Sequence, residues 1–137
     1  MMNGLHLTAD LKGCPGDGEL LVQVEALRSL CLREVRSAGL QPVGELFHRF
    51  PAAAAQACGG VTGVVLLAES HLAVHTWPER GAVTVDVFVC NLGSDNSASA
   101  RRLLDRLIEA FAATDVTRHA LQRGDVGLPT SPETSGA

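Results

Sequence analysis

The 137-residue chain is poor in aromatic side chains: it has no tyrosine, one tryptophan and four phenylalanines. Positive charge is scarce as well, because 11 Lys and Arg stand against 15 Asp and Glu and give a formal net charge of −4. A protein that binds nucleic acid needs a basic surface to neutralise the phosphates. We therefore expect no nucleic-acid partner.

Long apolar runs are also absent from the sequence. The longest one, "GGVTGVVLLA" at residues 59–68, is well short of the ~20 residues that a membrane-spanning helix needs. The opening "MMNGLHLTADL" has neither the basic start nor the cleavage site of a secretory signal. These features predict a cytoplasmic protein without a membrane anchor.

The four cysteines are Cys14, Cys31, Cys58 and Cys90, and no two of them form a CxxC pair or the close spacing of a zinc site. We expect no metal, and in a cytoplasm we expect reduced thiols. Cys14, Cys31 and Cys58 are interpreted as packing or surface positions, since a free cysteine often behaves as a small hydrophobic residue.

What the sequence does contain is typical of a compact globular protein, with 46% hydrophobic and 19% charged residues. Its length suffices for one hydrophobic core and is short for two. We therefore expect a single domain over residues 1–124. The polar end of the chain, "LPTSPETSGA", predicts a disordered tail over residues 125–137.

The residue patterns predict six strands and two helices. Strand patterns bounded by turn residues occur in six segments, at residues 5–11, 41–50, 60–68, within 66–79, and at 82–90 and 116–124. Helical spacing of leucine and valine predicts amphipathic helices at residues 19–38 and 98–114. Gly39 ends the first helix, and Ser97 or Asn96 is the expected cap of the second.

This order of elements predicts the fold class. Two helices are too few to cover both faces of a sheet, so we expect an α+β fold, a two-layer α/β sandwich. Its sheet is mainly antiparallel and both helices pack on one face. A second copy of the chain is the simplest cover for the other face.

One segment asks for a chemical explanation: "LLAESHLAVHTWPE", residues 66–79, holds the only tryptophan, two of the five histidines and a Glu-Ser pair. An ordinary strand has no need of so many reactive groups. His71 and His75 are four residues apart and share a strand face, but a third metal ligand is missing. Glu69 and Ser70 alone would also fit a polar turn. A serine hydrolase would need a GxSxG turn around Ser70 and an acidic partner for His75, and neither is evident.

Three motifs carry a resemblance to a known family. "ESHLAVHTWPE" at residues 69–79, "FHRF" at 47–50 and "DVFVC" at 86–90 occur at fitting distances. Together they resemble the prokaryotic S-adenosylmethionine decarboxylase proenzyme family, over about residues 4–124. The resemblance implies a pyruvoyl-dependent enzyme that decarboxylates S-adenosylmethionine and thereby supplies the aminopropyl donor for spermidine synthesis.

The resemblance also implies how the cofactor arises. The chain would cut itself between Glu69 and Ser70 into a β chain, residues 1–69, and an α chain, residues 70–137. The Ser70 hydroxyl would attack the Glu69 carbonyl, and β-elimination from the resulting ester would leave a pyruvoyl group at residue 70. Thr62 is expected to support the attack, and His75 to take the α-proton, because imidazole exchanges protons near neutral pH.

For turnover, the resemblance assigns a role to three further residues. The pyruvoyl carbonyl would form a Schiff base with the substrate amine and accept electrons as CO₂ departs. Cys90 would protonate the product. Phe50 would stack on the adenine and Glu79 would accept hydrogen bonds from the ribose. The family's mature unit is an (αβ)₂ dimer whose active sites draw on both protomers.

The sequence departs from the family pattern in two places. Thr62 stands where serine is usual, which adds a methyl group and stiffens the side chain. The loop "PAAAAQACGG" at residues 51–60 is longer than usual, next to Phe50.

Two alternatives to this function stay open. Relatives of the family decarboxylate L-ornithine or L-arginine. In such an enzyme the Glu79 carboxylate could pair with the ammonium or guanidinium group of the substrate. A non-catalytic binding protein is the other alternative, although Ser70, His75 and Cys90 are all present.

Overall fold

The computed structural model of the chain describes residues 4–52, 59–91 and 93–124. Its strands form one six-stranded sheet in the order β2-β3-β4-β5-β1-β6, and every neighbouring pair is antiparallel. The strands are β1 (Gly4–Lys12), β2 (Pro42–Arg49), β3 (Val61–Leu67), β4 (Ser70–Trp77), β5 (Ala82–Cys90) and β6 (Asp115–Arg123).

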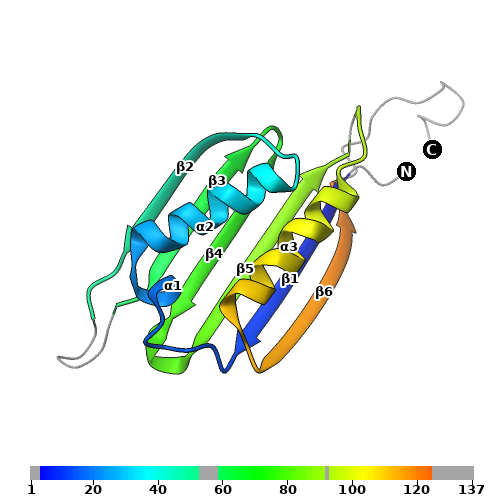
Figure 1. Cartoon of the computed structure of the whole chain (residues 1–137). Coiled ribbons are helices and arrows are strands. Elements are labelled where there is room, and N and C mark those ends of the chain that lie inside the picture. The colour runs from blue at the N-terminus through cyan, green and yellow to red at the C-terminus, as the bar shows by residue number, and fades with distance from the viewer. Residues whose placement is uncertain (1–3, 53–58, 92, 125–137) are drawn as a thin grey trace, which may run out of the picture.

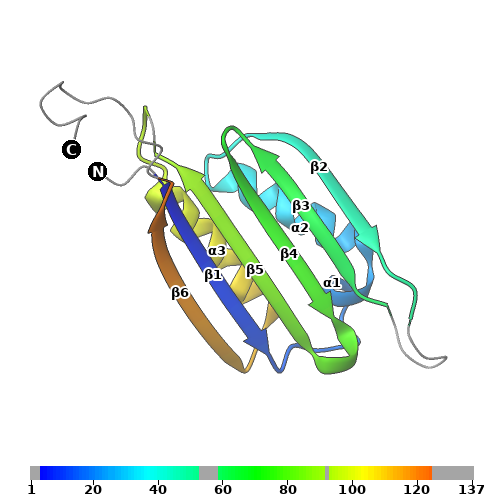
Figure 2. The same ribbon diagram turned by 180° about the vertical axis from the view of Figure 1, so that it is seen from behind.

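The helices of the described residues lie on one face of this sheet (Figure 1). They are α1 (Glu19–Val22), α2 (Val24–Ser37) and α3 (Ser97–Phe111), and a 3-10 helix, η1 (Pro78–Arg80), links β4 to β5. Figure 2 shows the opposite face of the sheet without a covering helix. The predicted α+β two-layer sandwich is therefore confirmed.

The core lies between the sheet and the helices. Along β5 the side chains of Val83, Val85, Val87 and Val89 are fully buried, while the residues between them are only partly buried. Successive strand residues point to opposite faces, so this alternation assigns the valines to the helix side. The apolar face of α3, including the buried Leu103, Leu104, Leu107 and Phe111, completes the core there.

The first predicted helix is wrong in one respect, because the structure divides it at Gln23. That residue has φ −103° and ψ 114°, an extended backbone that separates α1 from α2. The Leu21 carbonyl, instead of continuing a helix, accepts a hydrogen bond of 2.8 Å from the Thr76 hydroxyl of β4. The same hydroxyl accepts a hydrogen bond of 2.9 Å from the Val61 amide of β3. The break thus ties α1 to the sheet.

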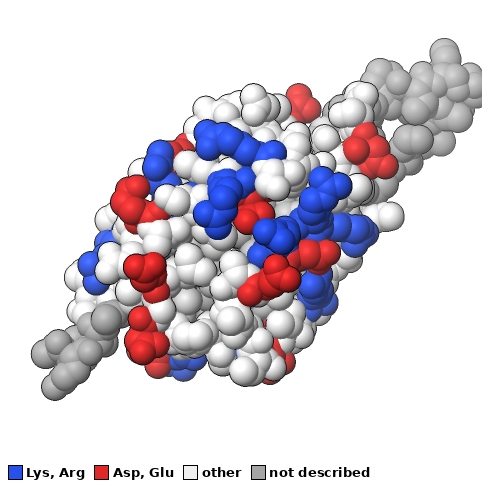
Figure 3. All heavy atoms as spheres, viewed as in Figure 1, with Lys and Arg blue, Asp and Glu red and all other residues white. Residues whose placement is uncertain are grey.

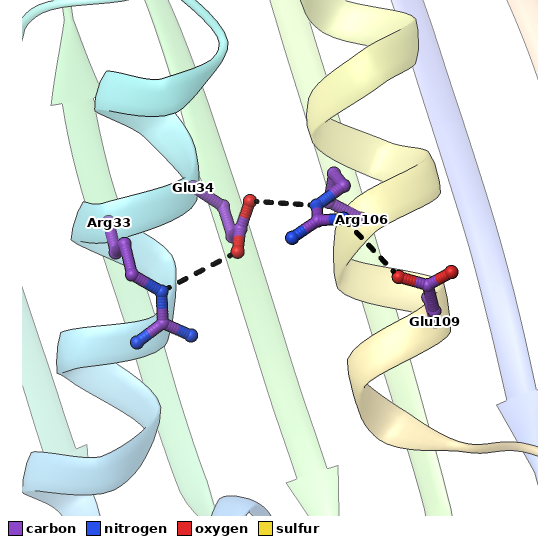
Figure 4. Close-up of polar contacts among 4 residues, drawn as sticks. All are labelled: Arg33, Glu34, Arg106 and Glu109. Carbon is purple, nitrogen blue, oxygen red and sulfur yellow. Dashed lines mark hydrogen bonds and ion pairs between the residues drawn. The ribbon is translucent and has the colours of Figure 1, made fainter.

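Ion pairs fasten the helix layer. Glu34 of α2 is only 5% exposed, and its carboxylate lies between Arg33, at 3.6 Å, and Arg106 of α3, at 3.3 Å (Figure 4). Arg28 of α2 donates hydrogen bonds to both carboxylate oxygens of Glu45 on β2, and this contact lowers the pKa of Glu45. Figure 3 shows acidic and basic side chains interspersed over the helix layer.

The start of α3 differs in detail from the expectation. Asn96 occupies the cap position, but its side chain does not cap the helix. Asp95 does so instead, since its carboxylate accepts a hydrogen bond of 2.9 Å from the Ser97 amide. That backbone contact lowers the pKa of Asp95. The side chain of Asn96 therefore has another partner, described below.

Some predictions fall outside the described part of the chain. The predicted tail at residues 125–137 and residues 53–58 of the long loop both lie there. Within the described residues, no helix is long and apolar enough to cross a membrane.

Candidate active site

The Glu69-Ser70 peptide lies in a tight turn. Ala68 and Glu69 join β3 to β4, and Leu67 pairs directly with Ser70 across the hairpin. Glu69 has a φ of +54°, a left-handed conformation that chains usually give to glycine or asparagine. Among the described residues, only Ala112, where α3 ends, shares this feature without being a glycine. The residue before Ser70 is thus held in an uncommon backbone conformation.

Cys90, the last residue of β5, contacts both residues of this peptide. Its backbone amide donates a hydrogen bond of 3.0 Å to the Ser70 hydroxyl. Its thiol donates to the Glu69 carboxylate over 3.4 Å. The structure therefore brings Glu69, Ser70 and Cys90, here called the Ser70 cluster, together within one chain.

Asn96 and Asn91 hold Cys90 from the other side. The Asn96 side-chain amide donates a hydrogen bond of 2.9 Å to the Cys90 carbonyl. The Asn96 backbone amide donates to the Asn91 side-chain carbonyl over 2.7 Å, and the Asn91 side-chain amide donates to the Ser97 hydroxyl over 3.0 Å. Sequence reasoning considered Asn96 only as a helix cap and missed Asn91; the polar run "NLGSDNS" directly after Cys90 was the available signal.

Thr62 and His75 form a second group, here called the His75 pair. They face each other across β3 and β4, with 3.0 Å between the Thr62 hydroxyl and His75 Nδ1. The His75 ring also lies against the Trp77 indole, with ring centroids 6.0 Å apart and planes 31° apart. Because Nδ1 contacts the Thr62 hydroxyl, Nε2 is the ring nitrogen to which no described residue forms a hydrogen bond.

Phe50 and Glu79 lie at the same end of the sheet as the His75 pair. Phe50 follows β2, is 48% exposed, and contacts the His48 ring with centroids 4.6 Å apart. His48 in turn pairs with Thr62 across β2 and β3. Glu79 is exposed on η1, two residues beyond Trp77. An aromatic ring and a carboxylate thus flank the pair.

The Ser70 cluster and the His75 pair do not meet within one chain. His75 is five positions after Ser70 on β4, which corresponds to about 16 Å along an extended strand. The odd spacing also assigns the two side chains to opposite faces of the strand. The structure therefore brings the predicted residues together in two groups rather than one, and an intrachain Ser-His hydrolase pair is excluded.

A further polar group lies on the uncovered face beside the Ser70 cluster. His6 Nε2 is 3.9 Å from the Asp86 carboxylate, and Arg123 lies 3.2 Å from His6 Nδ1. Burial lowers the pKa of His6 although Asp86 acts in the opposite direction. His71 packs on Phe88, with ring centroids 5.9 Å apart. Within the described ranges, no three His, Cys, Asp or Glu side chains are placed to hold a metal ion.

Two other cysteines occupy the positions expected for inert thiols. Cys14 and Cys31 are buried, and burial raises the pKa of the Cys31 thiol to about 12. Cys58 lies outside the described residues. Hollows on the surface between α3 and β6, and along α2, belong to the helix layer and reach neither group of site residues.

Comparisons with known proteins agree on one family. The model of the S-adenosylmethionine decarboxylase family matches residues 5–124. The S-adenosylmethionine decarboxylase proenzyme of Hydrogenobaculum sp. (strain Y04AAS1) is 37% identical over 121 residues, which cover 88% of this chain and 81% of the relative. The corresponding proenzyme of Archaeoglobus fulgidus is 34% identical over 124 residues, covering 90% of this chain and the whole relative.

A solved structure extends the similarity to three dimensions. The crystal structure of the adenosylmethionine decarboxylase from Aquifex aeolicus VF5 has a TM-score of 0.79 and 34% sequence identity to this chain. The match covers 94% of this chain and 97% of that one. The similarity therefore extends over nearly the whole length of both chains.

Proposed function

Because this chain belongs to the S-adenosylmethionine decarboxylase family, we propose that it is a proenzyme that cuts itself between Glu69 and Ser70 and then decarboxylates S-adenosylmethionine. The observation that carries the cleavage site is the Ser70 hydroxyl, held by the Cys90 amide beside a Glu69 with positive φ. The similarity to proenzyme relatives and to a solved adenosylmethionine decarboxylase supports the activity.

The first step is an acyl shift. The Ser70 oxygen attacks the Glu69 carbonyl carbon, the peptide C–N bond breaks, and an ester joins the two residues. A left-handed non-glycine residue is about 1–3 kcal/mol above a relaxed conformation. Opening the turn at Glu69 releases this strain, which favours the ester over the peptide.

The second step is β-elimination. A base removes the α-proton of residue 70, the Cβ–O bond breaks, and Glu69 leaves as a carboxylate. The dehydroalanine that remains tautomerises to an imine, and water then displaces ammonia to leave the pyruvoyl group at residue 70. The residues of the Ser70 cluster provide the nucleophile and its carbonyl target, but the base must come from elsewhere.

The His75 pair of a second copy of the chain is the base that fits. In the tautomer in which Nδ1 donates to the Thr62 hydroxyl, His75 keeps Nε2 free to accept a proton. Thr62 is placed beside it to donate to the developing oxyanion. Since about 16 Å separates His75 from its own Ser70, the pair acts on the Ser70 cluster of a second copy in a symmetric dimer. Cys90 of that cluster alternates with the helix-facing valines of β5 and thus belongs to the uncovered face shown in Figure 2.

Exposed apolar side chains on that face support the same dimer. Leu46 is 73% exposed, Leu121 is 57% exposed and Leu66 is 50% exposed. In the register of the sheet, these leucines alternate with the helix-facing residues. Their burial against a second copy accounts for an apolar surface that a monomer would leave in water.

In the mature enzyme, a pyruvoyl carbonyl at residue 70 would supply an electron sink for the electron pair that stays on the substrate when CO₂ departs. The Cys90 thiol, beside residue 70, protonates the product carbon. Phe50 stacks on the adenine and Glu79 accepts the ribose hydroxyls, both from the partner's side of the site because they lie with the His75 pair. A reducing cytoplasm suits an enzyme that needs this free thiol.

The test combines mass and turnover. Freshly purified protein is measured by intact mass under denaturing conditions and is then given S-adenosylmethionine, L-ornithine or L-arginine in parallel, with CO₂ as readout. We expect two fragments that meet at residues 69 and 70, the second with a pyruvoyl start, and CO₂ from S-adenosylmethionine. An uncut chain that releases no CO₂ would support a non-catalytic binding protein. CO₂ released only from L-ornithine or L-arginine would show that the substrate is that amino acid and not S-adenosylmethionine.

A further inference from the structure

The hydrogen bonds of Cys90 leave none of its polar groups free. Its amide donates to the Ser70 hydroxyl, its thiol donates to the Glu69 carboxylate, and its carbonyl accepts from the Asn96 side chain. Ladder pairing between β4 and β5 reaches His71 and Phe88 and stops before Cys90. On the β4 side of β5, side chains therefore make the contacts of the Cys90 backbone, while on the other side Cys90 pairs with Gly4 of β1.

We propose that Asn96 is a positioning residue for self-processing: by holding the Cys90 carbonyl, it aims the Cys90 amide at the oxygen that leaves residue 70 in β-elimination. This inference rests on the cleavage proposed above and specifies the donor for its second step. The Cys90 N–H and the Cys90 carbonyl belong to adjacent peptide planes that meet at the Cys90 Cα. A hydrogen bond that anchors the carbonyl restricts the backbone dihedrals of Cys90, and through them the direction of its N–H.

The bond changes show why the amide matters. In the ester, the Ser70 oxygen joins Cβ of residue 70 to the Glu69 carbonyl carbon. When the α-proton is removed, its electron pair forms the Cα=Cβ bond and the Cβ–O bond breaks. The former Ser70 oxygen then becomes part of the new Glu69 carboxylate and gains negative charge. The Cys90 amide, already 3.0 Å from this oxygen, donates to it more strongly as that charge develops.

Asn96 can hold this position because it is itself anchored. Its backbone amide donates to Asn91, whose side chain donates to Ser97 at the first turn of α3. That helix is fixed to the core by buried residues that include Ala100 and Leu103. The chain of contacts thus runs from a packed helix to the Ser70 oxygen, and Asn96 is the link that contacts Cys90.

The test uses Asn96→Asp, which keeps the shape but replaces the donor with a carboxylate at neutral pH. Processing is followed by intact mass, with and without hydroxylamine, which cleaves an ester into a Glu69 hydroxamate and a fragment that begins with serine. We expect cleavage to be about tenfold slower, as for the loss of one hydrogen bond in a transition state. We also expect the hydroxylamine products to increase, because elimination from the ester is the step that is slowed.

Asp95→Asn is the matched control, since it is the reverse substitution at the neighbouring residue and acts on the α3 cap without contacting Cys90. The inference predicts normal processing for this control. Should Asn96→Asp fail to fold, as judged by its unfolding midpoint, Asn96→Ala removes the same donor without adding a charge.

The outcomes separate the inference from the proposed function. Normal cleavage of Asn96→Asp, slowing without ester, or equal slowing of Asp95→Asn would overturn the positioning role while the wild-type chain still cuts itself. A wild-type chain that never cuts would overturn the proposed function first and this inference with it.

Discussion

The two ends of β4 carry different groups of predicted site residues, and the residues at one end contact each other more extensively than those at the other. At the Ser70 end, one chain brings the Ser70 hydroxyl and the Glu69 carboxylate into contact with Cys90. At the other end, Thr62 and His75 are hydrogen-bonded to each other, and Phe50 and Trp77 beside them stay partly exposed, without a group to act on. In the proposed function this difference means that each chain contributes half of two active sites.

Removing the nucleophile at the Ser70 end has the largest expected effect. Ser70→Ala should leave a single uncut chain with no CO₂ release, because neither the ester nor the pyruvoyl group can form. Intact mass and a CO₂ assay measure both losses. Normal turnover by this variant would refute the cofactor assignment.

Removing the base at the other end should have the next largest effect. His75→Ala is expected to slow processing by about 100-fold or more, the usual contribution of a positioned base. The time course of precursor loss on a denaturing gel measures it. Arg102→Ala, at an exposed residue of α3 in the helix layer, serves as the control, and unchanged processing in His75→Ala would remove His75 from this role.

Cys90→Ala is expected to separate self-processing from the decarboxylation that follows it. It keeps the backbone amide that contacts Ser70, so processing should stay within a few-fold of wild type. Turnover should fall by about 100-fold, or give product protonated on the wrong carbon, because the acid is missing. Mass of the chain and mass of the product provide the two readouts, and full activity would exclude Cys90 as the acid.

The smallest expected effect concerns stability beside the Ser70 end. Burial lowers the pKa of His6, against the attraction of Asp86 and with the repulsion of Arg123 and His71. The unfolded chain therefore binds more protons below pH 6.5, and stability is lost as the pH falls from there through the lowered pKa. His6→Asn should show a smaller fall in unfolding midpoint between pH 7.5 and 5.5 than wild type. An equal fall would show that His6 is not responsible.

The sequence predicted the sheet well where burial alone decides the pattern. Along β5, valines alternate with other residues because one face of the strand is buried in the core. This pattern can be recognised from the sequence without a structure. The break at Gln23 could not be read, because apolar spacing continues through it and the interruption depends on a hydrogen bond from Thr76, 55 residues away from Leu21. Long-range contacts of this kind leave no local pattern.

The sequence predicted which residues belong to the site, but not how they are arranged in space. The motifs named Ser70, His75 and Cys90, but strand alternation already assigned Ser70 and His75, five residues apart, to opposite faces. Asn96 was read as a cap because residue type favours that role before a helix. Its contact with Cys90 depends on how β5 meets α3 and could not be derived from residue type.

Mixed chains provide the most direct test of the shared active site. A Ser70→Ala chain and a His75→Ala chain, distinguished by tags, are produced together and analysed by intact mass. The shared site predicts that the His75→Ala chain is cut in mixed dimers, because its Ser70 meets the His75 pair of the other chain. If the His75→Ala chain stays uncut beside a folded Ser70→Ala partner, each chain uses its own histidine and the division of β4 into two half-sites is wrong.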